Sequence, residues 1–341
     1  MNTRKGVSRR PAQRRGLPLL AAAIVCGTGC AKDAELAKVT APPPARAVAQ
    51  ASASGPTYTT IDAPGDTGFT LAVDINKSGQ IVGRYTDVAT GNVHGFLLGG
   101  GTFTTITAPP AALWTRAISI NNGGDIVGDY SLIDQQGNKG VHGFLLHGGT
   151  FTSFDVPGSA GTVAEGIDTN GDIVGFYTLN DGSNTGTGSN NRHGFLLRNG
   201  VFTSIDFPGA GSTEMWKIND NGMILGRFKG TTDSKWHLYE LVGGSFKAVA
   251  DYPGATQIAP DGYAHVGGLN VQGDIVATYC LSTCNKFNAG VHGFLVSGGI
   301  YTTVEPPTAV GSLAFGINSN GYIVGTYADA AGVVHGFLRI P

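Results

Sequence analysis

The chain has 341 residues, of which 54 are glycine and only 13% are charged, and its formal net charge is −2. Residues 1–30 hold six of the 22 basic residues and no acidic one, which leaves 16 Lys and Arg against 24 Asp and Glu in the rest. An acidic chain with so few charges disfavours nucleic acid and anionic membrane surfaces as partners. We therefore predict no nucleic-acid partner, and membrane contact only through an N-terminal lipid anchor.

The N-terminus predicts an export signal, because a basic stretch precedes the short apolar run "LPLLAAAIVCGTGC" that ends at Cys30. This run is too short for a permanent membrane helix. Cys30 lies where a bacterial lipoprotein carries its lipidated cysteine, but the leucine usual three residues earlier is absent. Lipidation at Cys30 and cleavage to a free product both stay open. We predict an exported bacterial protein that is periplasmic, anchored in the outer membrane or extracellular.

Residues 31–56 are rich in Ala, Pro and Ser and show no hydrophobic periodicity, which indicates a flexible spacer. After the spacer, a motif of the form I-N-x-x-G-x-I-V-G-x-Y recurs six times at intervals of 45 to 51 residues. The copies occupy residues 75–85, 120–130, 167–177, 218–228, 269–279 and 317–327.

Each repeat contains four short β-branched runs and no helical periodicity. The motif itself gives two strands joined by a tight Asn-x-x-Gly turn, as in "INKSGQIVGRY" at residues 75–85. A segment such as "HGFLL" (94–98) and one such as "TFTTI" (102–106) follow, joined by a glycine turn. We therefore predict an all-β fold over residues 57–341, a six-bladed β-propeller of four-stranded antiparallel blades.

The ends of the repeat region favour a closed ring. An extra copy of the fourth strand, "TYTTID" (57–62), precedes the first unit, and the last unit ends at "HGFLRIP" without a fourth strand. The N-terminal strand is therefore expected to complete the sixth blade and to remove the open sheet edges. A β-solenoid remains the alternative, although its end repeats would differ from the others as caps.

These motifs resemble a family of bacterial extracellular repeats called HAF, after its His-Ala-Phe. The likeness covers residues 57–341, but every copy departs from His-Ala-Phe, mostly to His-Gly-Phe. The resemblance implies export and a propeller-like β-repeat, and it supplies no reaction.

Six of the eight histidines occupy one position of the repeat: His94, His142, His193, His237, His292 and His335. Equivalent positions lie a blade width apart, too far to share a metal with bonds of about 2.0–2.1 Å. We predict a structural role in which a ring nitrogen hydrogen-bonds to a loop carbonyl and ties one blade to the next. No metal site or other cofactor is predicted, with calcium at the polar insertion 179–192 as the remaining alternative.

Function is expected where the repeats differ, on the face that carries the long variable loops. The residues five positions before each turn Asn or Asp are Leu71, Arg116, Val163, Glu214, His265 and Leu313. Their neighbours add Trp114, Glu165, Trp216, Lys217 and Tyr263. Aromatic rings beside charged groups favour a pocket for a sugar or a small polar ligand. For catalysis the candidates are Glu214 and His265 as acid and base, and Arg116 to bind a substrate carboxylate.

The two cysteines outside the signal, Cys280 and Cys284, are close enough in sequence to form a disulfide in an oxidising compartment. Zinc binding is the alternative, but no second Cys/His pair accompanies them.

The leading functional hypothesis is an exported, monomeric, non-catalytic binding module that engages a glycan or an envelope protein. The alternatives are a polysaccharide lyase or glycoside hydrolase with a site at the central pocket, and a structural surface protein.

Overall fold

The computed structural model describes residues 55–109, 112–133, 139–179, 191–258, 267–281 and 290–341. Residues 51–341 form one compact unit, distinct from residues 1–50. The predicted signal, Cys30 and nearly all of the spacer lie outside the described residues. Within the described ranges, no helix is long and apolar enough to cross a membrane.

Antiparallel pairing groups the described strands into six consecutive units, which we call blades 1 to 6. Blade 1 contains β2 (Asp66–Ile75), β3 (Ile81–Asp87), β4 (Val93–Gly99) and β5 (Thr102–Ile106). Blade 2 contains β6 (Ala112–Ile120), β7 (Ile126–Ile133), β8 (Lys139–His147) and β9 (Thr150–Phe154). Blade 3 contains β10 (Ser159–Ile167), β11 (Ile173–Leu179), β12 (Arg192–Arg198) and β13 (Val201–Ser204).

The second half of the ring repeats this pattern with one irregular blade. Blade 4 contains β14 (Ser212–Ile218), β15 (Ile224–Lys229), β16 (Trp236–Val242) and β17 (Ser245–Ala248). In blade 5, β18 (Gln257–Ile258) and β19 (Gly267–Leu269) both pair with β20 (Ile275–Cys280), followed by β21 (Val291–Ser297) and β22 (Ile300–Val304). Blade 6 contains β23 (Gly311–Ile317), β24 (Ile323–Ala328), β25 (Val334–Ile340) and β1 (Thr57–Ile61).

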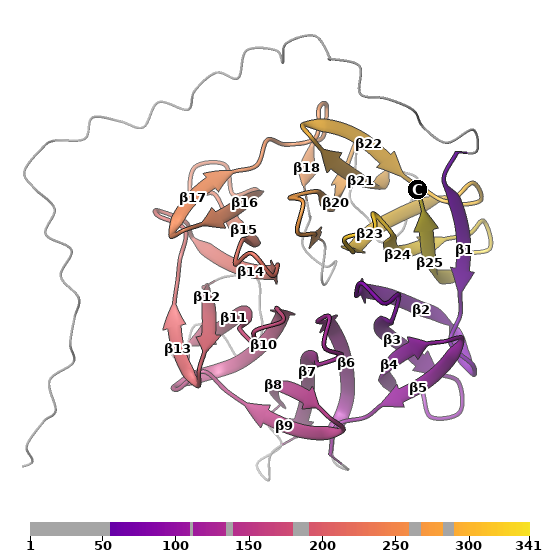
Figure 1. The fold of residues 1–341 in the computed structure, drawn as a ribbon, viewed down its shortest axis with the longest axis horizontal. Helices are drawn as coiled ribbons and strands as arrows, with labels where there is room; N and C mark the ends of the chain where they lie inside the picture. The colour runs from indigo at the N-terminus through magenta and orange to yellow at the C-terminus, as the bar shows by residue number, and fades with distance from the viewer. Residues whose placement is uncertain (1–54, 110–111, 134–138, 180–190, 259–266, 282–289) are drawn as a thin grey trace, which may run out of the picture. The chain divides into compact units, whose positions relative to one another are not determined.

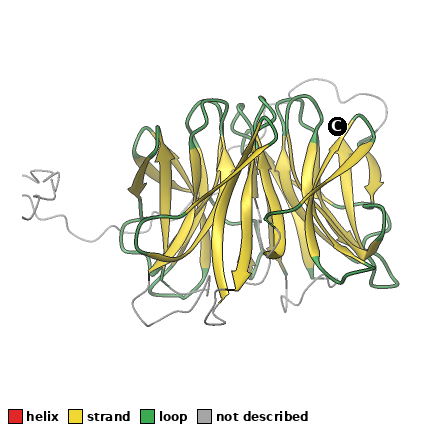
Figure 2. Ribbon diagram, turned by 90° about the horizontal axis from the view of Figure 1, so that it is seen from below, coloured by secondary structure: helices red, strands yellow, loops and turns green. Residues whose placement is uncertain are grey.

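The blades surround a central axis, with the first strand of each blade innermost and the fourth outermost (Figure 1). This arrangement confirms the predicted all-β propeller class. The strands run between two faces of the ring (Figure 2). We call the end with the hairpins between first and second strands the turn face. The opposite end, with the loops between second and third strands and between blades, is the loop face.

The turn-face hairpins form as the sequence predicts. In the first, the side-chain Oδ1 of Asn76 accepts the backbone N–H groups of Ser78 at 3.1 Å and Gln80 at 3.0 Å. Gly79 has φ 77°, a left-handed conformation that suits glycine. The flanking Ile75 is buried and anchors the turn to the core.

Packing between neighbouring blades requires the glycine of the His-Gly-Phe segment. A Cβ added at Gly95 would lie 3.0 Å from the backbone nitrogen of Ala117 in the next blade. Glycine therefore lets neighbouring blades approach closely at this point. The following Phe96 is fully buried and packs with Phe103 of the same blade, with ring centroids 5.3 Å apart.

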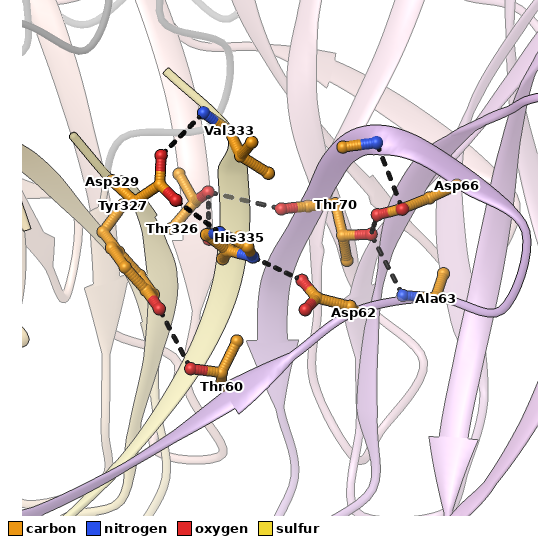
Figure 3. A network of polar contacts seen from close by, with 11 residues as sticks. Thr60, Asp62, Ala63, Asp66, Thr70, Thr326, Tyr327, Asp329, Val333 and His335 are labelled. Carbon is orange, nitrogen blue, oxygen red and sulfur yellow. Dashed lines mark hydrogen bonds and ion pairs between the residues drawn. The ribbon is translucent and has the colours of Figure 1, made fainter. Parts of the chain in front are cut away.

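The N-terminal strand closes the ring, as predicted. β1 pairs with β25 along its whole length, from Thr57 opposite Ile340 to Ile61 opposite Gly336. Side chains reinforce this junction (Figure 3): Thr60 Oγ1 lies 2.9 Å from the Tyr327 hydroxyl. Chain ends far apart in sequence thus complete one blade, and β25 is paired on both sides, with β24 and with β1.

Five of the six repeated histidines contact carboxylates and His94 contacts a threonine hydroxyl, rather than the loop carbonyls that the sequence analysis expected. The partner follows the fourth strand of the same blade, so the bond is made within a blade instead of between blades. The Nδ1 partners are Thr107 Oγ1 for His94 (3.3 Å), Asp155 for His142, Asp206 for His193, Glu305 for His292 and Asp62 for His335 (each 2.8 Å). His237 contacts Asp233 through Nε2 at 2.9 Å and Asp251 through Nδ1 at 3.5 Å.

A sequence signal for these partners exists. The Nδ1 partners occupy the same position of the repeat, just after the fourth strand of each blade. Each stands two residues before a proline, as in Asp62-Ala63-Pro64. A carboxylate accepts a stronger hydrogen bond from a histidine than a carbonyl does when the ring is charged. The pairs fix the start of each connection to the next blade.

Candidate functional site

Apolar side chains fill the axis of the ring, so it is not an open pore at this level. The buried residues of this core come from the first strands of several blades: Leu71, Val73, Ile118, Val163, Trp216, Leu313 and Phe315. Charged groups lie on both sides of this layer, one set toward the loop face and another at the turn face.

Glu214 is the centre of the charged set toward the loop face. Its Oε2 accepts Arg227 Nε at 2.8 Å and the Trp216 indole N–H at 2.9 Å, and its Oε1 accepts Arg227 Nη2 at 3.1 Å and a further bond from Arg192. Burial alone would raise the pKa of Glu214, but the charges of Arg227 and Arg192 outweigh it and lower the pKa to about 2. Glu214 is therefore ionised at neutral pH, and both its oxygens are engaged.

Arg116 forms the second ion pair, with Asp129 of the same blade. Its Nε donates to Asp129 Oδ1 at 2.7 Å, and its Nη2 donates to Oδ2. The side chain of Asp129 is fully buried, whereas that of Arg116 is 20% exposed. The guanidinium lies 4.5 Å from the ring centroid of Trp114, which is itself partly exposed. Arg116 and Trp114 thus present a joint polar and aromatic surface.

Glu165, from the first strand of blade 3, is the other carboxylate of the predicted cluster. Its side chain is buried, and burial together with the negative charge of Glu214 raises its pKa to about 8. The positive charges of Arg116, Lys217 and Arg227 act in the opposite direction but do not compensate. Glu165 is therefore protonated at neutral pH, while Glu214 is ionised.

Three residues of this charged set, Arg84, Asp129 and Arg227, belong to a repeat position that the sequence analysis missed. The position directly follows the glycine of the I-V-G motif and pairs with the inner-strand position that holds Arg116 and Glu214. Its six occupants are Arg84, Asp129, Phe176, Arg227, Thr278 and Thr326. These six residues differ from one another as much as the six inner-strand residues opposite them do. This variation was the sequence signal that could have revealed the position.

Lys217 lies on the other side of the apolar layer from Arg116 and Glu214, although its charge still acts on Glu165. Its Nζ reaches from blade 4 to Asp74 Oδ2 of blade 1 at 3.0 Å and to the Ile118 carbonyl of blade 2 at 3.4 Å. Asp74 Oδ2 also accepts Ser119 Oγ at 2.6 Å. Lys217 therefore ties together three blades near the axis.

A small polar cavity of about 70 Å³ opens beside this lysine at the turn face, lined by Lys217, Asp74 and the turn asparagines. Its volume suits a few water molecules rather than a sugar. Five turn residues donate from side-chain Nδ2 to the backbone carbonyl of the equivalent residue in the next blade. The links are Asn76 to Asn121 (3.1 Å), Asn121 to Asp168 (3.0 Å), Asn219 to Asn270 (2.8 Å), Asn270 to Asn318 (3.4 Å) and Asn318 to Asn76 (3.0 Å).

Several predicted site residues lie outside the described residues, namely Tyr263, His265, Cys284 and most of the insertion 179–192. Cys280 forms a disulfide bond. Its side chain is buried at the end of β20. Among the residues that the structure describes, no three His, Cys, Asp or Glu side chains are grouped so as to hold a metal ion.

Of the predicted ligand-binding residues that are described, the structure brings Trp114, Arg116, Glu165 and Glu214 into one electrostatic cluster. Trp216 is 2% exposed and fills the axial core, so its ring is not available for stacking on a ligand.

Comparison with known proteins supports the fold alone. No family model matches the chain, and no curated protein matches it, so the resemblance to the HAF repeats stays a prediction. A protein of unknown function from Dyadobacter fermentans is 10% identical with a TM-score of 0.50, over 84% of this chain and 99% of that one.

Two further solved structures match with lower TM-scores. TolB from Acinetobacter baumannii is 14% identical with a TM-score of 0.43, and the match covers 81% of this chain and 65% of the TolB chain. The β-propeller domain of the trilobed protease from Pyrococcus furiosus is 8% identical with a TM-score of 0.42, over 79% of this chain and 95% of that one. This chain thus spans about two thirds of the TolB structure.

Proposed function

We propose that this protein is an exported, non-catalytic binding module that engages a glycan through the loop-face side of its central cluster. The observation that carries the proposal is the pairing of Trp114 with Arg116, because both side chains are partly exposed and lie 4.5 Å apart. An indole beside a guanidinium offers an apolar ring face and hydrogen-bond donors together, which suits a sugar ring.

The state of the candidate catalytic groups favours binding over catalysis. Glu214 is 1% exposed and its oxygens are held by Arg192, Arg227 and Trp216. A general acid or base must reach the proton that it transfers, and a carboxylate with a pKa of about 2 is a poor base at neutral pH. Arg116 is likewise committed to Asp129.

One feature supports the alternative of a glycoside hydrolase or polysaccharide lyase. Glu165 and Glu214 have pKa values of about 8 and about 2, a separation that is typical of paired carboxylates with different roles in catalysis. In such an enzyme Glu165 would supply the proton. Both carboxylates are buried, so the test has to measure turnover as well as binding.

The experiment exposes the purified protein to a panel of soluble and insoluble polysaccharides and records both retention and release of reducing or unsaturated ends. We expect retention without release, and about tenfold weaker retention for Trp114→Ala. Tyr322→Ala is the matched control, since Tyr322 is a partly exposed aromatic residue in the Asn318 turn at the turn face. Release that is lost in Glu165→Gln would establish the enzyme instead. Absence of retention on every polymer would overturn the glycan proposal and favour an envelope protein as the partner.

A further inference from the structure

Arg84 is the arginine of the central cluster that forms no ion pair with any described residue. It lies midway along β3, opposite Leu71, and is partly exposed. Within the part of the chain that the structure describes, its guanidinium makes no hydrogen bond or ion pair with any side chain. A guanidinium carries five N–H donors. Those of Arg84 are therefore available to a ligand at the junction of blades 1 and 2.

The charges around Arg84 do not neutralise it. The nearby positive charge of Arg116 opposes it, and although Asp129 and Glu165 attract it, both oxygens of Asp129 already bind Arg116. Glu165 carries a proton at neutral pH, because its pKa is about 8. Burial and the Arg116 charge together lower the pKa of Arg84 to about 9. The guanidinium is thus still charged at pH 7 and lacks a partner.

The other arginines of the cluster each pair with a carboxylate, Arg116 with Asp129 and both Arg192 and Arg227 with Glu214. Among the described residues Arg84 has no such pair, and a largely buried charge without a partner is costly. A bound anion would supply the missing partner.

We propose that the ligand is a carboxylate-bearing polysaccharide, and that a uronate carboxylate binds to Arg84 beside the Trp114 and Arg116 surface. The planar fork of arginine matches a carboxylate through two parallel hydrogen bonds. This inference rests on the proposed glycan-binding function and specifies its ligand. The acidic composition of the chain outside residues 1–30 disfavours non-specific association with polyanions, so retention has to come from a local site.

The test measures retention on polygalacturonate and alginate, with dextran as the neutral polymer and dextran sulfate as the sulfated one. Arg84→Gln removes the fork, and Arg198→Gln is the matched control. Arg198 pairs with Asp172 through Nε at 2.7 Å, lies at the turn face and is 54% exposed, so its loss changes the net charge equally. We expect the wild type and Arg198→Gln to retain the carboxylated polymers, and Arg84→Gln to lose tenfold or more in affinity.

A second measurement separates binding from folding. A soluble oligogalacturonate should raise the melting temperature of the wild type and of Arg198→Gln, but not that of Arg84→Gln. In the absence of ligand Arg84→Gln should be as stable as the wild type, because an uncompensated cation is removed. Marked destabilisation by this substitution would make Arg84 a structural residue and overturn the inference.

The remaining outcomes are distinct. Equal retention of dextran and polygalacturonate, unaffected by Arg84→Gln, would overturn the anionic ligand but leave the glycan-binding function. Retention on dextran sulfate alone would overturn the carboxylate assignment. No retention on any polymer would refute the proposed function itself.

Discussion

The chain of amide hydrogen bonds at the turn face is interrupted at one blade, and Asp168→Asn should close it. The interruption arises because Asp168 carries a carboxylate where the other five turns carry an asparagine amide. Among the described residues, no side chain donates to the carbonyl of Asn219 in the next blade, whereas each equivalent carbonyl has such a donor. In Asp168→Asn, the amide oxygen can still accept the backbone N–H groups of Asn170 and Asp172, which Asp168 Oδ1 accepts at 2.9 Å each.

The expected gain is about 1 kcal/mol in the free energy of unfolding, the usual net contribution of one buried hydrogen bond. For a unit of this size it corresponds to a rise in melting temperature of about 2–4 °C. The gain also depends on pH. Burial raises the pKa of Asp168 above 3.8, so ionisation of this carboxyl opposes folding. That penalty is absent below pH 3.8 and complete above the folded-state pKa, so the gain should be larger at pH 7 than at pH 3.5.

Asn219→Asp is the matched control, because it introduces the same carboxylate one blade further along. Asn219 donates to the Asn270 carbonyl at 2.8 Å, and its Oδ1 accepts Asn221 and Met223 in the same geometry as Asp168. Asn219→Asp should lower the free energy of unfolding by about 2 kcal/mol, because the buried carbonyl of Asn270 loses its side-chain donor. Thermal unfolding followed by circular dichroism measures both variants. If neither melting temperature changed at pH 7, the amide chain would not contribute to stability and the reasoning would be refuted.

Three further predictions follow from the ion pairs. His142→Ala should lower the melting temperature by about 2 °C, because it removes one partly exposed bond, and should leave polysaccharide retention unchanged; loss of retention with an unchanged melt would contradict the structural role. Hydrogen bonding to Asp251 raises the pKa of His237 above 6.5, so its contribution to stability is complete below pH 6.5 and is lost as the pH rises through the raised pKa. The stability difference between the wild type and His237→Gln should therefore shrink from pH 6 to pH 9, and a constant difference would refute the pairing. Lys217→Met should lower the free energy of unfolding by about 3–5 kcal/mol, because it leaves the buried Asp74 without its cation, and adding Asp74→Asn should restore part of this stability.

The fold was predictable because the repeat imposes the same physical requirement six times. Each Asn-x-x-Gly turn needs a left-handed glycine, and Gly79 has it. The displaced strand at 57–62 closes the ring because its partner, β25, has the same flanking pattern as every third strand. A single short strand is hard to predict, but six copies of the same pattern support one another. The hydrophobic pattern and the turn residues were therefore sufficient to predict the fold.

The site was only partly predictable, because its geometry depends on contacts between repeats. The inner-strand position drew attention to Arg116 and Glu214, but the prediction did not consider the equally variable second-strand position, from which Asp129 and Arg227 pair with them. The position of Lys217 at the turn face follows from a register shift between Met215 and Lys217, which single-strand alternation does not reveal. The carboxylate partners of the histidines were missed because the expected contact was between blades.

The charged cluster is not required by the scaffold, and blade 6 demonstrates this within the same chain. There the two positions that hold Glu214 and Arg227 in blade 4 are occupied by Leu313 and Thr326, and the blade keeps the same pairing. Buried ion pairs are often less stabilising than apolar residues of similar size. Stability therefore does not explain why blades 1 to 4 carry the four arginines of this cluster. The proposed recognition of a negatively charged ligand would explain them, and it makes Arg84, which pairs with no side chain among the described residues, the most informative position to substitute.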